Sequence, residues 1–216
     1  MISLYDHPLS GNCYKVRLLL SHLGVHYERI TIDFFKGENK TEDFKKLNPN
    51  QKIPVIRDGD LILWESSAIL LYLGKKFSPN IYYSEELDRF GLISQWLFFG
   101  KTSIDPSLAR ARFMTRFVPE EKRDEGELRS LRNAGESALQ ILEDQLKKND
   151  FLAGSYSLAD IGCFPYVNMA EEGGVSLTPF PSVISWCERI GSQPGYISIV
   201  LEEKSHRGHG GFREKI

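Results

Sequence analysis

The first part of the chain carries two hydrophobic patterns of different period. Ile2 and Leu4 alternate with polar residues, and this period of two predicts a short strand. The apolar residues that follow are spaced as on one face of a helix: Val16, Leu19, Leu20 and Leu23. Gly24 ends that predicted helix, and residues 25–33 have the composition of a second strand. Together these segments predict a right-handed βαβ unit with two parallel strands.

A predicted hairpin and a helix follow after a polar loop. The segment "KIPVIRDGDLILWE" has two strand-like halves around an Asp-Gly-Asp turn, and "SAILLYLGKKF" continues directly as a helix. The order βαβ then ββα is that of a small α/β domain of thioredoxin type. Pro54 stands at the entry of a strand, where it gives up a hydrogen-bond donor of the ladder. It is either a plain strand-edge proline or, as this topology implies, part of a cis Ile53–Pro54 bond.

The second part of the chain has helical patterns. A polar, proline-containing break at 78–86 ends the strand signals. Beyond it, apolar residues recur at intervals of three and four along one long predicted helix: Leu128, Leu131, Ala138, Leu139, Leu142 and Leu146. Pro181 suits the first turn of another helix, and "PGYISIVLEE" (194–203) suggests a last one. Ser157 and Asp160 resemble a capping box at a buried helix start, which is a structural role.

The sequence therefore predicts an α/β domain followed by an all-helical domain. The predicted limits are residues 1–77 for the first domain, 78–86 for a linker, 87–205 for the helical bundle and 206–216 for a flexible tail. With 216 residues, of which 41% are apolar, the chain is long enough to fill both cores without disulfides.

The charge balance excludes some classes of partner. Lys and Arg number 27 against 29 Asp and Glu, and the net charge of -2 gives no reason to expect nucleic acid or an anionic membrane surface. No apolar run approaches the roughly 20 residues that span a bilayer, and "MISLYDHP" lacks the features of a signal peptide. We expect a soluble cytoplasmic protein with a small, roughly neutral partner.

The cysteine and histidine spacings give no reason to expect a metal. Cys13, Cys163 and Cys187 are odd in number, far apart and without a CxxC spacing, so neither disulfides nor a structural zinc are expected. His206 and His209 have the spacing of metal ligands, but no other Cys, His or carboxylate cluster accompanies them.

Four segments carry a family resemblance. They are "HPLSGNCYKVR", "NPNQKIPVI", "WESSAILLYL" and "SLADI". Together they resemble the cytosolic glutathione transferases of serine type, such as bacterial nu-like and plant phi-like members, over essentially the whole chain. The resemblance implies a thioredoxin-like domain that binds glutathione as cosubstrate, a helical domain that holds a small apolar electrophile, and a homodimer.

The pair Glu65-Ser66 precedes a predicted helix and suits the head group of an amino acid. Ser66 is placed as the N-cap, where unpaired amides and the helix dipole form a site for a carboxylate. Glu65 can hold the ammonium group beside it. The alternative is a helix cap with a solvated acid. The resemblance assigns the pair to the γ-glutamyl end of glutathione.

The resemblance also assigns the rest of the tripeptide. Ile53, between Lys52 and the cis proline Pro54, presents its backbone to the cysteinyl part, and such pairing depends little on side chains. Lys40 stands where phi members carry a lysine near the glycine carboxylate, and Asn39 replaces the histidine of many of them. A solvated loop lysine is the alternative for Lys40.

The turn before the first helix holds the candidates to act on the thiol. The thiolate is the reactive form, and a hydroxyl that donates to sulfur at a helix N-terminus favours it. Ser10 supplies such a hydroxyl, and the resemblance places it where phi and zeta members carry their activating serine. Asn12 is either a second donor to sulfur, as in nu-like members, or a cap of the helix. Cys13 and Tyr5 are expected to pack.

Residues 95–113 supply the candidate wall for a second substrate. Spacing alone does not decide whether four of them face that electrophile or the core: Phe98, Phe99, Thr102 and Phe113. The predicted function is conjugation of the glutathione thiolate to a small apolar electrophile, with Ser10 stabilising the thiolate. A glutathione-dependent disulfide reductase and a non-catalytic binding member of the family are the alternatives.

Overall fold

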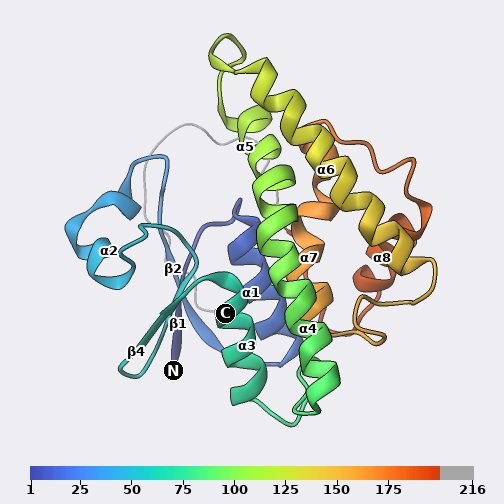
Figure 1. Ribbon diagram of the computed structural model, residues 1–216. Coiled ribbons are helices and arrows are strands. Elements are labelled where there is room, and N and C mark those ends of the chain that lie inside the picture. The colour runs from blue at the N-terminus through green and yellow to red at the C-terminus, as the bar shows by residue number, and fades with distance from the viewer. Residues whose placement is uncertain (200–216) are drawn as a thin grey trace. The chain divides into compact units, whose positions relative to one another are not determined.

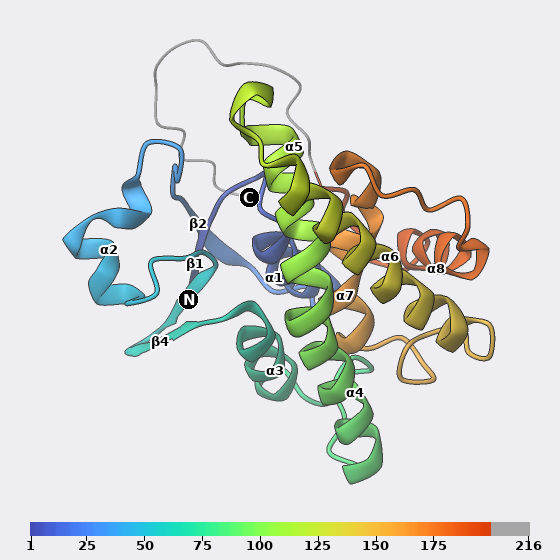
Figure 2. The ribbon, with the colours of Figure 1, turned by 45° about the horizontal axis from the view of Figure 1, so that its top comes forward.

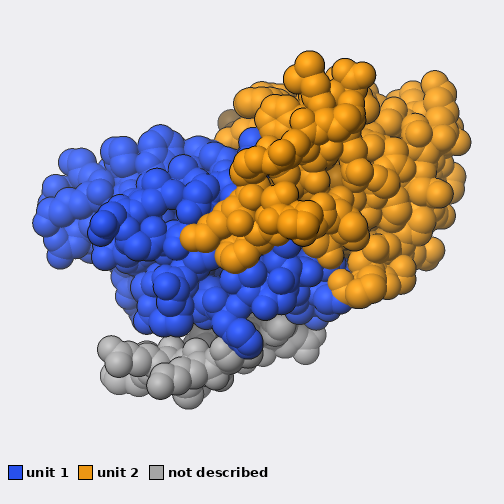
Figure 3. Space-filling view, turned by 90° about the horizontal axis from the view of Figure 1, so that it is seen from below, with its two compact units in different colours: residues 1–73, 195–216 blue, residues 74–194 orange. Residues whose placement is uncertain are grey.

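The computed structural model describes residues 1–199, which form two compact units (Figure 3). The first comprises residues 1–73 and, from the end of the described chain, 195–199, and the second comprises residues 74–194. This division differs from the predicted domain limits, because it falls inside a helix and assigns the last described residues to the first unit. The predicted tail, 206–216, lies outside the described residues.

The first unit is built on a four-stranded sheet with the order β2-β1-β3-β4. Its strands are β1 (Ile2–Asp6), β2 (Tyr27–Thr31), β3 (Val55–Asp58) and β4 (Leu61–Trp64). β1 and β2 are parallel, while β3 is antiparallel to both β1 and β4. The predicted βαβ unit and the hairpin are therefore confirmed, and the Ile53–Pro54 bond is cis.

Helices cover both faces of this sheet. α1 (Gly11–His22) and α3 (Ser66–Lys76) lie on one side, and α2 (Glu42–Leu47) lies on the other (Figures 1 and 2). A short 3-10 helix, η1 (Glu38–Lys40), precedes α2, and both lie in the segment predicted from its pattern as a polar loop. The core of the unit takes its fully buried side chains from α1, α3 and the sheet: Leu4, Val16, Leu19, Leu20, Val55, Ile56, Ile69 and Leu70.

The second unit is helical throughout. Its elements are α4 (Leu87–Phe99), the π-helical η2 (Gly100–Ala109), α5 (Arg110–Phe117), η3 (Glu120–Lys122), α6 (Glu125–Leu146), α7 (Leu158–Asn168), η4 (Ala170–Gly173) and α8 (Pro181–Gly191). The predicted long helix is α6, and Pro181 occupies the first turn of α8 as expected. α7 packs against α4, η2 and α8 and is buried over all but its last residue, so it forms the centre of this unit.

The start of α7 is closed by the predicted capping box. The Ser157 hydroxyl oxygen accepts from the Ala159 amide at 3.3 Å, and Asp160 Oδ2 accepts from the Ser157 amide at 3.0 Å. Asp160 Oδ1 accepts from the Leu152 amide and from the Trp186 indole, both at 2.9 Å. Burial raises the pKa of Asp160 to about 6, although these donors oppose the shift. The carboxylate thus joins α7 to the preceding loop and to α8.

The helix predicted over 194–203 is wrong over residues 194–199, which are the described part of that range and are not helical. Gly195 has a φ of 78°, a left-handed conformation that does not continue a helix. The carbonyls of this segment are also bound elsewhere: the Ser21 hydroxyl donates to Gly195 O at 2.8 Å, and the Tyr14 hydroxyl donates to Ile197 O at 2.5 Å. Side chains of α1 therefore take the carbonyls that a helix would use. The rest of the segment lies outside the described residues.

Candidate functional site

Three of the segments predicted to form the site meet at one end of the sheet. Tyr5 of β1 pairs with Val55 of β3, and Val55 pairs in turn with Trp64 of β4. One residue further along each strand, towards the same end of the sheet, come Asp6, Pro54 and Glu65. The turn before α1, the segment before the cis proline and the start of α3 are neighbours for this reason.

Ser10 is the N-cap of α1. Its backbone is extended (φ -82°, ψ 116°), and its hydroxyl oxygen accepts from the Cys13 amide at 3.3 Å. A serine hydroxyl that accepts a hydrogen bond still has a proton to donate. The first turn of α1 contains no acidic residue, so the helix sequence does not neutralise the positive end of its own dipole. The Ser10 hydroxyl therefore lies where a negative charge is stabilised.

Asn12 joins the start of α1 to the start of α3. The Ser66 hydroxyl donates to Asn12 Oδ1 at 3.1 Å, and Ser66 is only 3% exposed. Since Ser10 caps α1, Asn12 is not the cap, and its amide nitrogen is a donor. This contact brings the residues predicted for the thiol and for the γ-glutamyl group into one cluster.

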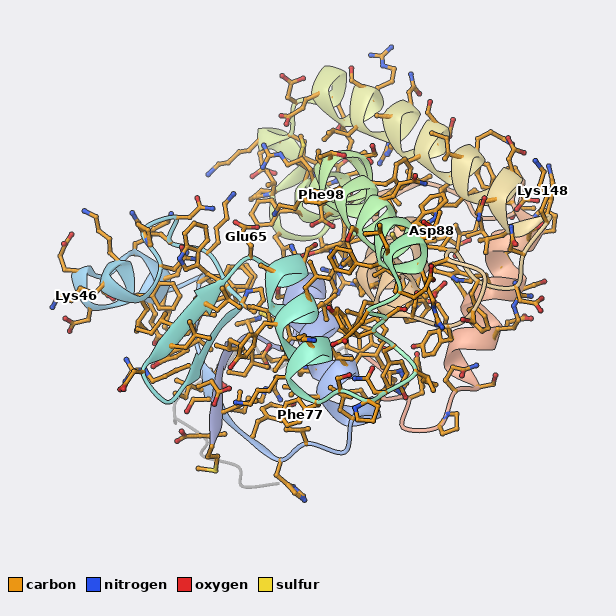
Figure 4. All side chains as sticks on the ribbon, turned by 60° about the horizontal axis from the view of Figure 1, so that its bottom comes forward. Lys46, Glu65, Phe77, Asp88, Phe98 and Lys148 are labelled. Atoms are coloured by element: carbon orange, nitrogen blue, oxygen red, sulfur yellow. The ribbon has the colours of Figure 1, made fainter. Side chains whose placement is uncertain are left out.

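Glu65 has a backbone conformation that is unusual for a residue with a side chain. Its φ is 71°, a region that costs a non-glycine residue on the order of 1–3 kcal/mol and is found mostly at functional sites. Ser66 is the first residue of α3, one position earlier than predicted, and the Glu65 carbonyl accepts from the Ile69 amide at 3.0 Å. Figure 4 shows Glu65 where β4 leads into α3, and its carboxylate accepts from Asn50 Nδ2 at 3.3 Å. The first amides of α3 can bind a carboxylate, and Glu65 can bind an ammonium group.

Two asparagines hold the segment before the cis proline. Asn39 Nδ2 donates to the Gln51 carbonyl at 2.8 Å, and Asn48 Nδ2 donates to the Lys52 carbonyl at 2.6 Å. With those two carbonyls occupied, the backbone of Ile53 is the next group along the segment for pairing with a peptide. The buried Asn48 is not among the residues predicted for the site, because an Asn-Pro pair signals a turn but not this contact.

Lys40 lies at the end of η1, directly after Asn39. The bond from Asn39 to Gln51 therefore brings this turn to the segment before the cis proline. Lys40 is exposed and forms no ion pair with any residue of the described range. Its ammonium group can therefore form an ion pair with the carboxylate of a ligand. The Lys52 side chain is exposed as well.

Two other residues near the turn have surroundings typical of packing. Cys13 is fully buried, and burial raises the pKa of its thiol far above the usual value, while the Ser10 hydroxyl and the His7 backbone oppose only part of that rise. The Tyr5 ring packs edge-on against Phe44, with the ring centroids 6.3 Å apart. Both residues pack, as expected from the sequence.

The candidates for the second-substrate wall belong to the second unit. Phe98 and Phe113 are 67% and 39% exposed, so core packing does not explain them (Phe98 is labelled in Figure 4). Phe99 is partly buried, and its ring meets Trp96 edge-on with the centroids 5.4 Å apart. Thr102 lines a depression of about 480 Å³ between η2 and α6, which the three phenylalanines do not line. A joint role of the four residues stays a prediction.

Residues 1–199 contain neither a candidate metal-binding cluster nor a candidate membrane-spanning helix. No group of three or more His, Cys, Asp and Glu side chains in residues 1–199 is arranged to hold a metal ion. No helix in that range is both long enough and apolar enough to cross a bilayer. His206 and His209 lie outside the described residues.

Similarity to known proteins extends over both units. The family described as "Glutathione S-transferase, N-terminal domain" matches residues 1–75, and "Glutathione S-transferase, C-terminal domain" matches residues 107–194. YfcG of Escherichia coli K12, named a disulfide-bond oxidoreductase, is 32% identical over 215 residues, covering 94% of this chain and 95% of that protein. A crystal structure of a glutathione S-transferase from Pseudomonas fluorescens is 36% identical with a TM-score of 0.87, covering 92% of this chain and 98% of that one. The glutathione transferase URE2P6 from Phanerochaete chrysosporium, in complex with oxidized glutathione, is 30% identical with a TM-score of 0.83, covering 90% and 92%.

Proposed function

The chain belongs to the glutathione S-transferase family, and we propose that it conjugates the glutathione thiolate to a small apolar electrophile. The contact between Asn12 and Ser66 carries this proposal, because it joins the candidate thiol residues of α1 to the candidate head-group site of α3. A ligand with an amino-acid head group at one end and a thiol a few bonds away matches that arrangement.

The proposed complex assigns each part of glutathione to one segment. The first amides of α3 bind the γ-glutamyl carboxylate, together with the Ser66 hydroxyl, whose one proton turns from Asn12 to the ligand. Glu65 binds the ammonium group. The backbone of Ile53 pairs with the cysteinyl part, and Lys40 holds the glycine carboxylate. The electrophile meets side chains of the second unit: Phe98, Phe99, Thr102 and Phe113.

The proposed chemistry depends on the charge of the sulfur. The glutathione thiol gives its proton to solvent, and the Ser10 hydroxyl donates a hydrogen bond to the resulting thiolate. The positive end of α1 stabilises the same charge. The sulfur then forms a bond to the electrophilic carbon, and the leaving group departs with the electron pair of the bond that breaks. Positioning and electrostatic stabilisation therefore supply the catalysis.

Reduction of disulfides by glutathione is a second candidate function. The similarity to a protein named a disulfide-bond oxidoreductase and the sequence Ser10-Gly11-Asn12 favour it. In that reaction the thiolate attacks one sulfur of the disulfide and the other sulfur leaves as a thiolate. A second glutathione then releases the product from the mixed disulfide and forms glutathione disulfide. This route requires no cysteine of the protein, in agreement with the burial of Cys13.

Two assays with glutathione separate these functions. Chloride release from a chromogenic aryl chloride measures conjugation, and loss of hydroxyethyl disulfide measures reduction. We expect chloride release above the rate without protein, and a lower rate in Ser10→Ala. Turnover of the disulfide alone would support the reductase. Glutathione binding without either reaction would identify a non-catalytic member of the family.

We also propose a homodimer that acts in the cytoplasm in detoxification, as the resemblance to the cytosolic family implies. Apolar side chains on the helical unit support pairing, because they are largely exposed in the single chain: Leu87 (79%), Leu92 (46%) and Ile141 (51%). Light scattering measures the mass in solution, and the mass of a single chain would contradict the dimer.

A further inference from the structure

One buried side chain, that of Arg17, holds the turn before α1. Arg17 lies on α1 itself, and its side chain is 8% exposed. Its Nη1 donates to both carboxylate oxygens of Asp6, at 2.6 and 2.8 Å. The same guanidinium donates to the His7 carbonyl at 3.3 Å and to the Pro8 carbonyl at 3.1 Å. One planar group therefore ties the end of β1 to the two residues that follow it.

Arg17 reaches Ser10 through a shared carbonyl. The His7 carbonyl accepts from the Ser10 amide at 3.0 Å as well as from Arg17. On its other side, Ser10 is held by the bond from the Cys13 amide to its hydroxyl oxygen. The position of the Ser10 hydroxyl thus depends on where Arg17 holds the His7 carbonyl.

A second arginine, Arg29, pairs with the same carboxylate but does not contact the turn. Asp6 is fully buried and also accepts from Nε of Arg29 on β2. The Arg29 side chain is 34% exposed and contacts the Asp6 carboxylate rather than the turn. Both arginines thus pair with one buried carboxylate, but Arg17 alone of these two holds the carbonyls of the turn. Arg29 is for this reason a matched control for Arg17.

We propose that Arg17 is a positioning residue of the thiol site, which holds the His7 and Pro8 carbonyls so that the Ser10 hydroxyl faces the thiol of bound glutathione. The inference rests on the proposed function, because it takes glutathione as the ligand. Lysine cannot replace Arg17 in this role. Its ammonium group is a point donor on a flexible stem, whereas a guanidinium donates in several fixed directions at once.

The test compares Arg17→Lys with Arg29→Lys, which both keep the positive charge. For each protein we measure the affinity for glutathione and the absorbance of the bound glutathione thiolate against pH. Arg17→Lys is expected to raise the apparent pKa of the bound thiol by about one unit, because the hydroxyl no longer donates well to sulfur. Its affinity for glutathione at low pH, where the ligand is a thiol in every variant, is expected to stay at the parent value. Arg29→Lys is expected to titrate like the parent.

A double substitution shows whether the effect passes through Ser10. In a Ser10→Ala background, Arg17→Lys is expected to add no further shift, because the hydroxyl that it positions is gone. A further shift of the same size, or an equal shift in Arg29→Lys, would overturn the proposal, because the effect would then not pass through the Ser10 hydroxyl. An Arg17→Lys titration that overlays the parent would also overturn it.

A variant that does not fold and a parent protein that does not bind glutathione are distinguished from a failure of the proposal. If the lysine variant does not fold, Arg17→Gln takes its place and Arg29→Gln becomes its control, because both substitutions remove one positive charge. A larger shift in Arg17→Gln than in Arg29→Gln is expected, since an amide reaches fewer acceptors than a guanidinium, and equal shifts would contradict the proposal. A parent protein that binds no glutathione contradicts the proposed function. A parent that binds and titrates, with an unshifted Arg17 variant, contradicts only the role of Arg17.

Discussion

Two helices of this protein begin with a serine cap, and they use it in opposite ways. At α7, Ser157 and Asp160 are fully buried, and the carboxylate accepts from four donors. At α1, Ser10 is partly exposed, and the first turn holds no acidic residue. The chain itself closes and neutralises the start of α7, whereas the start of α1 can receive a negative charge from outside. A serine cap therefore indicates a site where its hydroxyl stays accessible and no carboxylate completes the box.

Removing the carboxylate at the start of α7 is expected to have the largest effect, which is a loss of stability. Asp160→Ala leaves the buried donors of Leu152 and Trp186 without their acceptor, and we expect the free energy of unfolding to fall by about 4 kcal/mol. Urea unfolding followed by circular dichroism measures this loss. Asp124→Ala is the control, because it removes an exposed cap of α6 that accepts from the Glu127 amide, with an expected cost of about 1 kcal/mol. Equal losses in the two variants would contradict the special role of the buried carboxylate at the start of α7.

Adding a carboxylate to the start of α1 is expected to have the next largest effect, which is on the pKa of the bound thiol. Asn12→Asp puts a carboxylate into the first turn of α1, as Asp160 stands in that of α7, and keeps an acceptor for Ser66. The new charge lies near the proposed thiolate, so we expect the pKa of bound glutathione thiol to rise by about one to two units. The unliganded protein is expected to gain up to about 1 kcal/mol, because an acid near a helix N-terminus is favourable.

Activity against pH and thermal unfolding measure these two opposite effects of Asn12→Asp. The control is Asn12→Ala, which removes the same amide without adding a charge. A pH profile identical to that of the parent would show that the start of α1 does not contact the sulfur.

The smallest effect is expected from a substitution at the start of α3, and it is on the affinity for glutathione. Ser66→Ala removes the hydroxyl that donates to Asn12 in the unliganded protein. In the proposed complex the single proton of that hydroxyl turns to the γ-glutamyl carboxylate. We expect glutathione to bind about tenfold more weakly, with little change in the pKa of the bound thiol. Calorimetric titration measures the affinity, and Ser67→Ala, one residue further along α3, is expected to bind like the parent. A shifted pKa with unchanged affinity would assign Ser66 to the thiol instead of the head group.

The parts of the fold that were predictable depend on short windows of sequence. The four strands, α1 and α3 of the first unit, α6 and the box at Ser157 follow from hydrophobic period, turn residues and cap residues. η1 and α2, in contrast, lie in a segment whose hydrophobic pattern indicated only a polar loop. The predicted helix that is absent over residues 194–199 shows the limit of such patterns. Ser21 and Tyr14 take its carbonyls, and both lie on a helix far away in sequence.

The candidate site was predictable as a set of segments but not as a set of contacts. Cap chemistry and the family resemblance indicated Glu65 and Ser66 before any geometry. Three contacts depend on how β1, β3 and β4 align. They are the hydrogen bonds from Ser66 to Asn12, from Arg17 to the His7 carbonyl and from Asn48 to the Lys52 carbonyl. The positive φ of Glu65 also depends on its tertiary surroundings, because a glutamate does not favour it by itself.

The central claim is that Ser10 stabilises a thiolate that belongs to the cosubstrate. The most direct test is the ultraviolet absorbance of bound glutathione thiolate against pH in the parent, Ser10→Ala and Asn12→Ala proteins. We expect Ser10→Ala to move the midpoint towards that of free glutathione by about one unit or more, and Asn12→Ala to move it less. A Ser10→Ala curve that overlays the parent, while Asn12→Ala moves towards free glutathione, would contradict this account.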